Sequence, residues 1–188
     1  MSSNQDRYFK PGVMLFPLRK YLSGTQNSFI QTYVKPGMTV LDLGCGPGFF
    51  TTSLSEMVGS RGIVYAVDGD EAVMNKLRER VEKLNLNNVR HFVSSASDIP
   101  FIPDESIDFL FSNGLMCCML NHEGAVNEMA RVMKPGSMGF ISVTKVLRNS
   151  DTGVSKGEWD DILNTFNIVK KGSSIMMDWA VVSKHPEN

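Results

Sequence analysis

The chain has 188 residues, of which 42% are hydrophobic and 21% are charged, and its formal net charge is -1. This length favours a single domain with one continuous sheet, and the composition is that of a globular protein rather than a disordered one. The charge balance excludes an overall basic field of the kind that draws a protein to nucleic acid or to an anionic membrane. We therefore expect neither a nucleic-acid partner nor a membrane partner.

The chain start and the cysteines indicate a compartment. Residues 1–6 are polar and lack the apolar centre of a signal peptide, and no apolar run approaches the length that crosses a bilayer. The three cysteines show no C-x-x-C spacing, so they predict neither a disulfide framework nor a zinc site. We expect a cytoplasmic protein with free thiols and no metal site.

Residues 1–37 precede the first predicted strand and stand apart from the rest. Apolar spacing predicts a short helix around Leu15–Leu22 and another around Phe29–Tyr33, with a break between them. We expect this segment to form a helical lid over a ligand site that is built by residues 38–188. The plain alternative is a helix that packs permanently on the sheet.

Strand and helix signals alternate after residue 38, which favours a parallel sheet. The predicted strands are residues 39–43, 63–67, 89–93, 107–111 and 138–143. Besides a helix after the first strand, helices are predicted from residue 70 to 84, 123 to 132 and 158 to 166. Apolar runs at 168–169 and 175–182 predict a hairpin. The expected fold class is α/β, a doubly wound, mostly parallel sheet with an antiparallel edge strand and helices on both faces.

The most informative segment is Val40–Phe49, where an apolar run contains Asp42 and then places glycine at alternate positions. This pattern is typical of a strand that opens into a tight turn against a ligand, followed by a helix N-terminus. A phosphate-binding P-loop would need a lysine after the last glycine, and there is none. The dinucleotide motif would need a third glycine where Phe49 stands. A nicotinamide-dependent oxidoreductase therefore stays as the weaker alternative.

The segment Leu41–Gly48 resembles the first motif of the class I S-adenosylmethionine-dependent methyltransferases, within the small-molecule branch called type 11. Four further segments match that family in order and spacing, namely Tyr65–Asp68, Ser95–Phe101, Ser106–Asn113 and Arg131–Gly136. The resemblance implies a Rossmann-like fold and transfer of a methyl group from S-adenosyl-L-methionine to a small molecule, which leaves S-adenosyl-L-homocysteine. A non-catalytic protein that binds the cofactor as a partner or sensor is the alternative, and a homodimer is open.

The resemblance also implies a cofactor site, formed by Asp42, Gly44, Cys45, Gly46, Asp68, Gly69, Ser95, Ala96 and Asn113. Asp68 would accept hydrogen bonds from the ribose hydroxyls, unless it only caps the following helix. Asp42 and the glycine loop would hold the methionine end, although Asp42 could instead satisfy loop amides. Ser95 stands where the family commonly has an acidic residue that binds the adenine amino group, and an uncharged hydroxyl is a weaker acceptor.

The segment after the fourth strand is where the family contacts its acceptor. Leu115–Leu120 is apolar, so acceptor contact and core packing are both open. The Asn/Asp-Pro-Pro-Tyr/Phe motif of enzymes that methylate nucleobases is missing there. The adjacent Cys117 and Cys118 suggest arsenite methylation, but the arsenite enzymes place their cysteines elsewhere. His122 is a candidate general base, with a surface histidine as the alternative; the catalytic residue is otherwise unknown.

Overall fold

The computed structural model describes residues 24–145 and 154–185. Its strands are β1 (Thr39–Leu43), β2 (Ile63–Asp68), β3 (Val89–Val93), β4 (Ile107–Asn113), β5 (Met133–Thr144), β6 (Asn167–Ser173) and β7 (Met177–Ser183). Its helices are α2 (Gly24–Tyr33), α3 (Phe49–Val58), α4 (Glu71–Lys83), α5 (His122–Val132) and α6 (Lys156–Asn164), with a 3-10 turn, η1 (Met116–Cys118).

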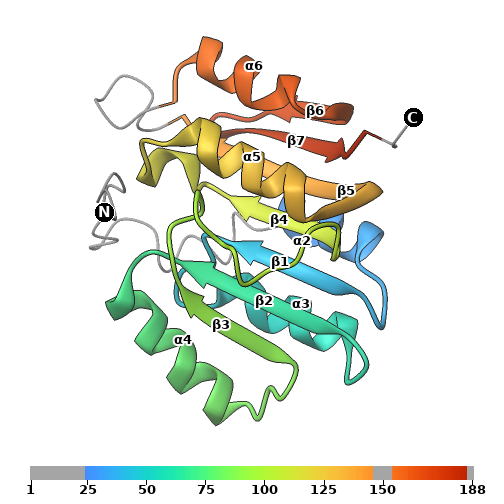
Figure 1. The fold of residues 1–188 in the computed structure, drawn as a ribbon, viewed down its shortest axis with the longest axis vertical. Helices are drawn as coiled ribbons and strands as arrows, with labels where there is room; N and C mark the ends of the chain where they lie inside the picture. Colours follow the sequence, from blue (N-terminus) through green and yellow to red (C-terminus); the bar gives the residue numbers. More distant parts are fainter. Residues whose placement is uncertain (1–23, 146–153, 186–188) are drawn as a thin grey trace.

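The seven strands form one sheet in the order β3-β2-β1-β4-β5-β7-β6 (Figure 1). Strands β1 to β5 pair in parallel, whereas β7 runs antiparallel to β5 and β6 runs antiparallel to β7. The chain winds outward from β1 to β3, then returns to place β4 on the other side of β1. The predicted Rossmann-like, mostly parallel sheet with an antiparallel edge is confirmed.

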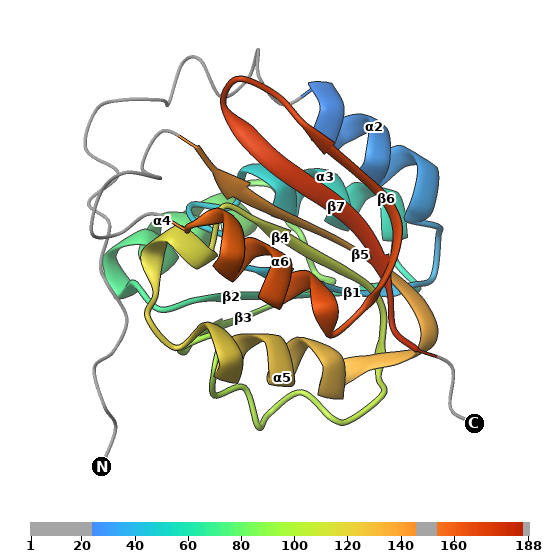
Figure 2. The ribbon, with the colours of Figure 1, turned by 90° about the horizontal axis from the view of Figure 1, so that it is seen from above.

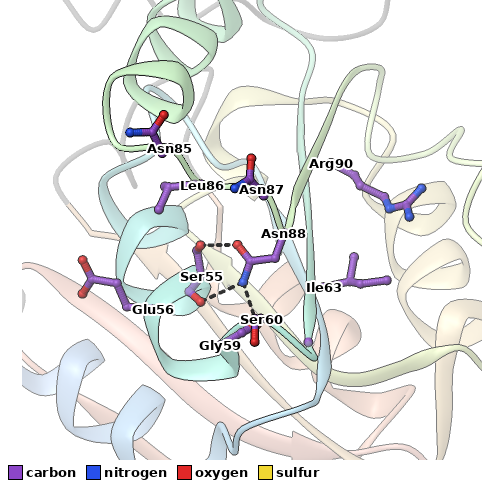
Figure 3. A pocket seen from close by; sticks show the side chains of 11 residues that line it. Ser55, Glu56, Gly59, Ser60, Ile63, Asn85, Leu86, Asn87, Asn88 and Arg90 are labelled. Carbon is purple, nitrogen blue, oxygen red and sulfur yellow. Dashed lines mark hydrogen bonds between the residues drawn. The ribbon is translucent and has the colours of Figure 1, made fainter.

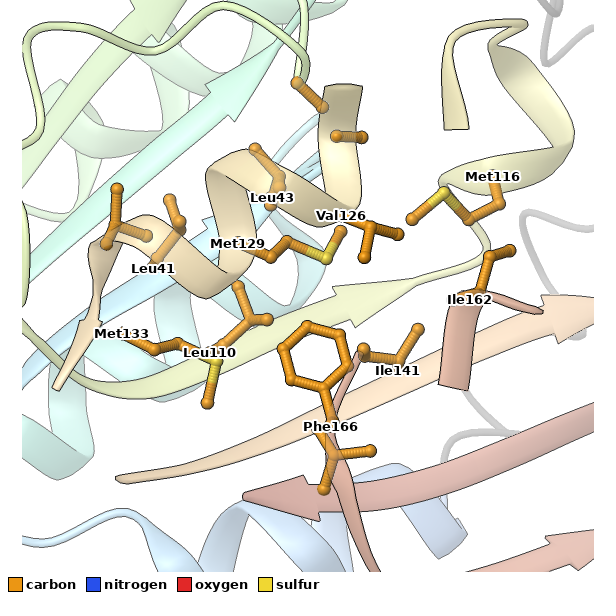
Figure 4. Close-up of a cluster of buried hydrophobic side chains, with 14 of the residues drawn as sticks. Leu41, Leu43, Leu110, Met116, Val126, Met129, Met133, Ile141, Ile162 and Phe166 are labelled. Carbon is orange, nitrogen blue, oxygen red and sulfur yellow. The ribbon is translucent and has the colours of Figure 1, made fainter. Parts of the chain in front are cut away.

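Helices cover both faces of the sheet (Figure 2). Helices α2, α3 and α4 pack on one face and α5 and α6 on the other. The alternation of side chains along β4 sets this arrangement, because Phe109 and Phe111 point to the first face and Leu110 to the second. Figure 4 shows Leu110 among side chains of α5 and of the segment after α6, including Met129 and Phe166.

Some element bounds differ from the predicted ones. Strand β4 continues to Asn113, because its backbone stays paired with β5 although Ser112 and Asn113 are polar. The predicted hairpin is confirmed, but its turn comes later than expected, since Lys170 and Lys171 belong to β6. Both lysines are exposed on the edge strand, where charged side chains meet solvent and discourage pairing with another chain.

The predicted helix around Phe29–Tyr33 is confirmed as α2. Ile30 and Val34 are buried against the sheet, and the ring of Phe29 lies 4.6 Å from that of Trp179 on β7. This part of the expected lid therefore packs on the same core as the strands. The predicted helix around Leu15–Leu22 lies outside the described residues, so the lid stays a prediction there. In the described ranges, no helix is long and apolar enough to cross a membrane.

Candidate functional site

The strand order reverses between β1 and β4, and open α/β sheets bind ligands at the carboxyl ends of the strands at such a point. The loops that follow these two strands touch each other. Gly44 has φ +79°, and a Cβ there would lie 2.9 Å from Cβ of Leu115, so a larger residue would force the loops apart.

The glycine loop is fixed to the end of β2. The amides of Gly44 and Cys45 both donate to the carbonyl oxygen of Val67, at 2.8 and 3.1 Å. Gly46, at φ +56°, is the position where a Cβ would meet nothing within 4 Å, so the backbone there faces open space. The Gly46 backbone is therefore open to close approach by a ligand.

Asp68 joins the end of β2 to the glycine loop. Its Oδ2 accepts from the Gly46 amide at 2.9 Å, and its Oδ1 accepts from the Asp70 amide at 3.1 Å. Asp70 provides the side chain that caps α4, by accepting from the amides of Ala72 and Val73. Asp68 is therefore not the helix cap.

Asp42 lies in β1 beneath the loop, with only 2% of its surface exposed. Its Oδ2 accepts from the hydroxyl of Thr51 on α3 at 2.6 Å. Sequence reasoning missed Thr51, although a polar residue on the inward face of an apolar helix is a signal that it serves a buried polar group. The Thr51 contact orients the carboxylate and joins β1 to α3.

The Cys45 thiol is buried in the glycine loop, and nearby charges affect its pKa. Its sulfur lies 3.5 Å from that of Met74, and burial, followed by the nearby charges of Asp42 and Asp68, raises the pKa of its thiol well above the ordinary value. The thiol therefore stays protonated and serves as a small packing group. Asp68 is hydrogen-bonded to this loop and Asp42 lies in β1 just before it, an arrangement that suits a ligand with cationic or hydroxyl groups.

The loop after β3 carries the expected adenine contacts. The Ser94 amide donates to the Asp68 carbonyl oxygen at 3.1 Å, which places this loop beside the end of β2. The Ser95 hydroxyl lies 2.8 Å from that of Ser97 and accepts from the Ser97 amide at 3.2 Å. Ala96 is buried in the core. Ser95 is thus held in a local turn, where its hydroxyl already contacts the hydroxyl and the amide of Ser97.

Asn113 ends β4 and lies on the α2 side of the sheet. Its Oδ1 accepts from the Ser142 hydroxyl at 2.9 Å and from Gln26 Nε2 at 3.4 Å. Gln26, which sequence reasoning missed, is 4% exposed on α2 and also contacts the sulfur of Met177. Nothing in the local sequence distinguishes it from a surface glutamine. Asn113 is therefore tied to β5 and α2 next to the switch point.

Comparison with known proteins now decides the family. A model described as a methyltransferase domain, of type 31, matches residues 34–176. The chain belongs to the class I S-adenosylmethionine-dependent methyltransferases. A solved methyltransferase of this kind from Aquifex aeolicus is 30% identical with a TM-score of 0.78, and the match covers 89% of this chain and 93% of that one. The matched model supports the class, and the type 11 branch stays a prediction from the sequence.

Curated relatives also match this methyltransferase. Demethylmenaquinone methyltransferase of Geobacillus stearothermophilus is 30% identical over 120 residues, which is 64% of this chain and 51% of that protein. Arsenite methyltransferase of Halobacterium salinarum is 31% identical over 115 residues, which is 61% of this chain and 29% of that protein. The chain spans about half the length, or less, of these curated relatives.

The residues present fit the cofactor of this family. The backbone at Gly46 is open, and a Cβ on Gly114, at the end of β4, would also meet nothing within 4 Å. Asp68 accepts from the Gly46 amide, and Asp42 lies in β1 just before this glycine loop. Such a cradle suits the ribose hydroxyls and the ammonium group of S-adenosylmethionine. In the described part of the chain, no three His, Cys, Asp or Glu side chains gather as metal ligands.

His122, the weak candidate for a general base, begins α5. One ring nitrogen, Nε2, lies 2.8 Å from the carbonyl oxygen of Met116, and Nδ1 lies 3.9 Å from a carboxylate oxygen of Glu158 on α6. The ring thereby connects η1, α5 and α6. Both nitrogens have a protein neighbour, which favours a structural role.

An open hollow of about 400 Å³ lies at the opposite end of the sheet (Figure 3). The loops before β2 and β3 line it. Asn88 donates to the carbonyl oxygens of Ser55 and Gly59, both at 2.9 Å, and thereby holds the end of α3 against β3. Because it sits at the amino ends of the strands, this hollow is separate from the cofactor site.

Proposed function

We propose that this methyltransferase transfers the methyl group of S-adenosylmethionine to a small-molecule acceptor at the carboxyl edge of the sheet. The observation that carries the proposal is the glycine loop beside the switch point between β1 and β4, where Asp68 accepts from the Gly46 amide and Asp42 lies in β1 just before the loop. Both carboxylates lie at the ends of parallel strands, where the fold binds its ligands.

The proposed site divides along the sheet edge. Asp68 and Gly69 would hold the ribose, and Asp42, with the backbone of Gly44, Cys45 and Gly46, would hold the methionine end. Ser95 and Ala96 would flank the adenine, and Asn113 would lie on the acceptor side. Support for this division comes from the hydrogen bonds that join the three loops, from Gly46 to Asp68 and from Ser94 to Asp68.

Positioning would be the main catalytic contribution of the protein. When bound, S-adenosylmethionine supplies a methyl group that its sulfonium already activates. The chain then has to hold a nucleophile in line and exclude water. Met116, Cys117 and Met119 are buried in the core, whereas Leu120 is 49% exposed. Acceptor contacts in this segment would therefore come from Leu115 and Leu120 rather than from the buried sulfur-containing side chains.

The acceptor class is proposed as a small molecule. The curated relatives are named for demethylmenaquinone and for arsenite, which are small-molecule acceptors of those proteins. The formal net charge of -1 gives no overall positive field that would attract nucleic acid.

We also keep as proposals a cytoplasmic location and a homodimer. The part of residues 1–37 that precedes α2 would cover the site, so cleavage near Arg19 should slow when S-adenosylhomocysteine is added, while cleavage at Lys35, after α2, should not.

Two measurements test the proposed function. Calorimetry should show one site per chain for S-adenosylhomocysteine and no binding of a nicotinamide dinucleotide, and the reverse result would favour an oxidoreductase. The protein is then incubated with methyl-labelled cofactor and extract of its source cells, and labelled products are identified by mass spectrometry. A labelled small molecule is expected. Tight cofactor binding without any labelled product would favour the sensor alternative.

A further inference from the structure

The loop between β3 and β4 has no regular secondary structure over residues 94–106, yet it carries Ser95 and Ala96. Its course is fixed in part by apolar side chains. Ile99 and Ile102 are fully buried, and the ring of Phe101 stacks on that of Phe92 at 4.2 Å. Burial of side chains alone leaves the backbone amides and carbonyls of such a loop in need of partners.

An ion pair on α5 supplies those partners. Arg131 donates to both carboxylate oxygens of Glu128, from Nε at 2.7 Å and from Nη2 at 2.8 Å. Their side chains are only 27% and 19% exposed, so the pair is partly shielded from solvent. The hydrogen bonds from Arg131 are the main cause that lowers the pKa of the Glu128 carboxyl, which therefore stays charged at neutral pH.

Both members of the pair bind the backbone of the loop. The Ile99 amide donates to Glu128 Oε2 at 3.0 Å, and Arg131 Nη2 donates to the Ile99 carbonyl oxygen at 3.0 Å. Arg131 Nη1 donates to the Ile102 carbonyl oxygen at 2.9 Å and to Asp104 at 2.5 Å. The planar guanidinium therefore serves five acceptor atoms on four residues, in a fixed geometry that lysine does not reproduce.

The contacts that hold Ile99 in place also restrain Ser95, through the hydrogen bonds of Asp98. Asp98 precedes Ile99, its amide donates to the Ser95 carbonyl oxygen at 3.1 Å, and its own carbonyl oxygen accepts from the Ser94 hydroxyl at 2.6 Å. The turn that contains Ser95 and Ala96 is thus closed at its far end by the residue next to the Glu128 and Arg131 contacts. A shift of Ile99 would move this turn.

We infer that Arg131, acting with Glu128, is a positioning residue for recognition of the purine base of the cofactor. This inference rests on the proposed function, because it takes the Ser95 turn to face the adenine amino group. Arg131 does not itself touch the base; it fixes the turn that does. Loss of the Arg131 contacts should therefore reduce the preference for a 6-amino over a 6-oxo purine more than it weakens overall binding.

The test compares two ligands, S-adenosylhomocysteine and S-inosylhomocysteine, whose bases differ in the 6-substituent and in N1, which accepts a hydrogen bond in adenine and donates one in the 6-oxo purine. Calorimetry is done on the full chain and on Arg131→Lys, Arg131→Met and Glu128→Gln. In the unmodified protein we expect a preference of about tenfold for the adenosyl ligand, the scale of one hydrogen bond. In each variant the preference should fall below about threefold, while the inosyl ligand binds within about threefold of its original affinity.

The matched control is Arg78, which forms an ion pair with Glu71 at 2.6 Å on α4, outside the loop. Arg78→Lys and Arg78→Met should leave the preference unchanged. An unchanged preference in folded Arg131→Lys and Glu128→Gln would overturn the inference, even if Arg131→Met fails to fold. So would an unmodified protein that binds both ligands equally. If the unmodified protein binds neither ligand, the proposed function itself fails.

Discussion

The backbone amide of Gly46 donates to the side chain of Asp68 across 2.9 Å, which joins the loop after β1 to the end of β2. The glycine and the carboxylate therefore act as one unit, and neither can move without the other. The carboxylate that we propose for ribose recognition is thus oriented by the loop itself.

Replacing Asp68 by alanine should weaken binding of S-adenosylhomocysteine by about 1.5–3 kcal/mol, the scale for lost hydrogen bonds to a charged group. Asp70→Ala is the matched control. It removes the cap of α4 and should cost about 0.5–2 kcal/mol of stability while leaving the dissociation constant unchanged. Calorimetry and urea unfolding measure the two effects. Equal affinity in Asp68→Ala would remove this carboxylate from the site.

Gly46→Val should abolish measurable cofactor binding, because its side chain would fill the open space beside the loop. Gly136→Val is the control, since Gly136 also has positive φ, at +72°, and a Cβ there meets nothing within 4 Å. Both variants should lose about 1–3 kcal/mol of stability from backbone strain. Only the change at Gly46 should affect titration with S-adenosylhomocysteine. Retained binding in Gly46→Val would contradict the proposed approach to the loop.

Ser95→Asp should tighten cofactor binding by up to about 1 kcal/mol, because a carboxylate is a stronger acceptor for the adenine amino group. The same charge placed two residues later, in Ser97→Asp, should not tighten binding. Both changes break the contact between the hydroxyls of Ser95 and Ser97. Comparing the two variants therefore distinguishes the effect of losing this contact from the effect of adding a carboxylate at position 95. Dissociation constants decide the matter. Weaker binding in Ser95→Asp would show that the backbone or another residue binds the base.

Stability should fall with pH above about 8.5, the ordinary pKa of a cysteine, because Cys45 is one group whose pKa is raised on folding. The unfolded chain releases this proton first, so the contribution is complete below that pH and is lost as the pH rises toward the folded pKa. Cys45→Ala should flatten the slope between pH 8.5 and 9.5, and Cys118→Ala should not. Urea unfolding at several pH values measures it. An unchanged slope in Cys45→Ala would assign the effect elsewhere.

The sequence by itself determined the class of sheet and the edge at which we propose that the cofactor binds. Strand and helix periodicity, the glycine spacing of Gly44 to Gly48 and the acidic start of α4 are signals between near neighbours along the chain. Such signals depend on local backbone preference and on which face each residue presents. For the same reason the helix at Phe29 was predictable, although its partner on the sheet was not.

Only the tertiary structure decided which polar groups meet. Asp68 and Asp70 look alike in sequence, and the position of the glycine loop makes the first its partner and leaves the second as the helix cap. Thr51 meets Asp42, and Arg131 meets Ile99, because the strand order brings distant segments together. A buried polar group must find a partner wherever the packed chain supplies one, and a sequence does not state distances between segments that join only on folding.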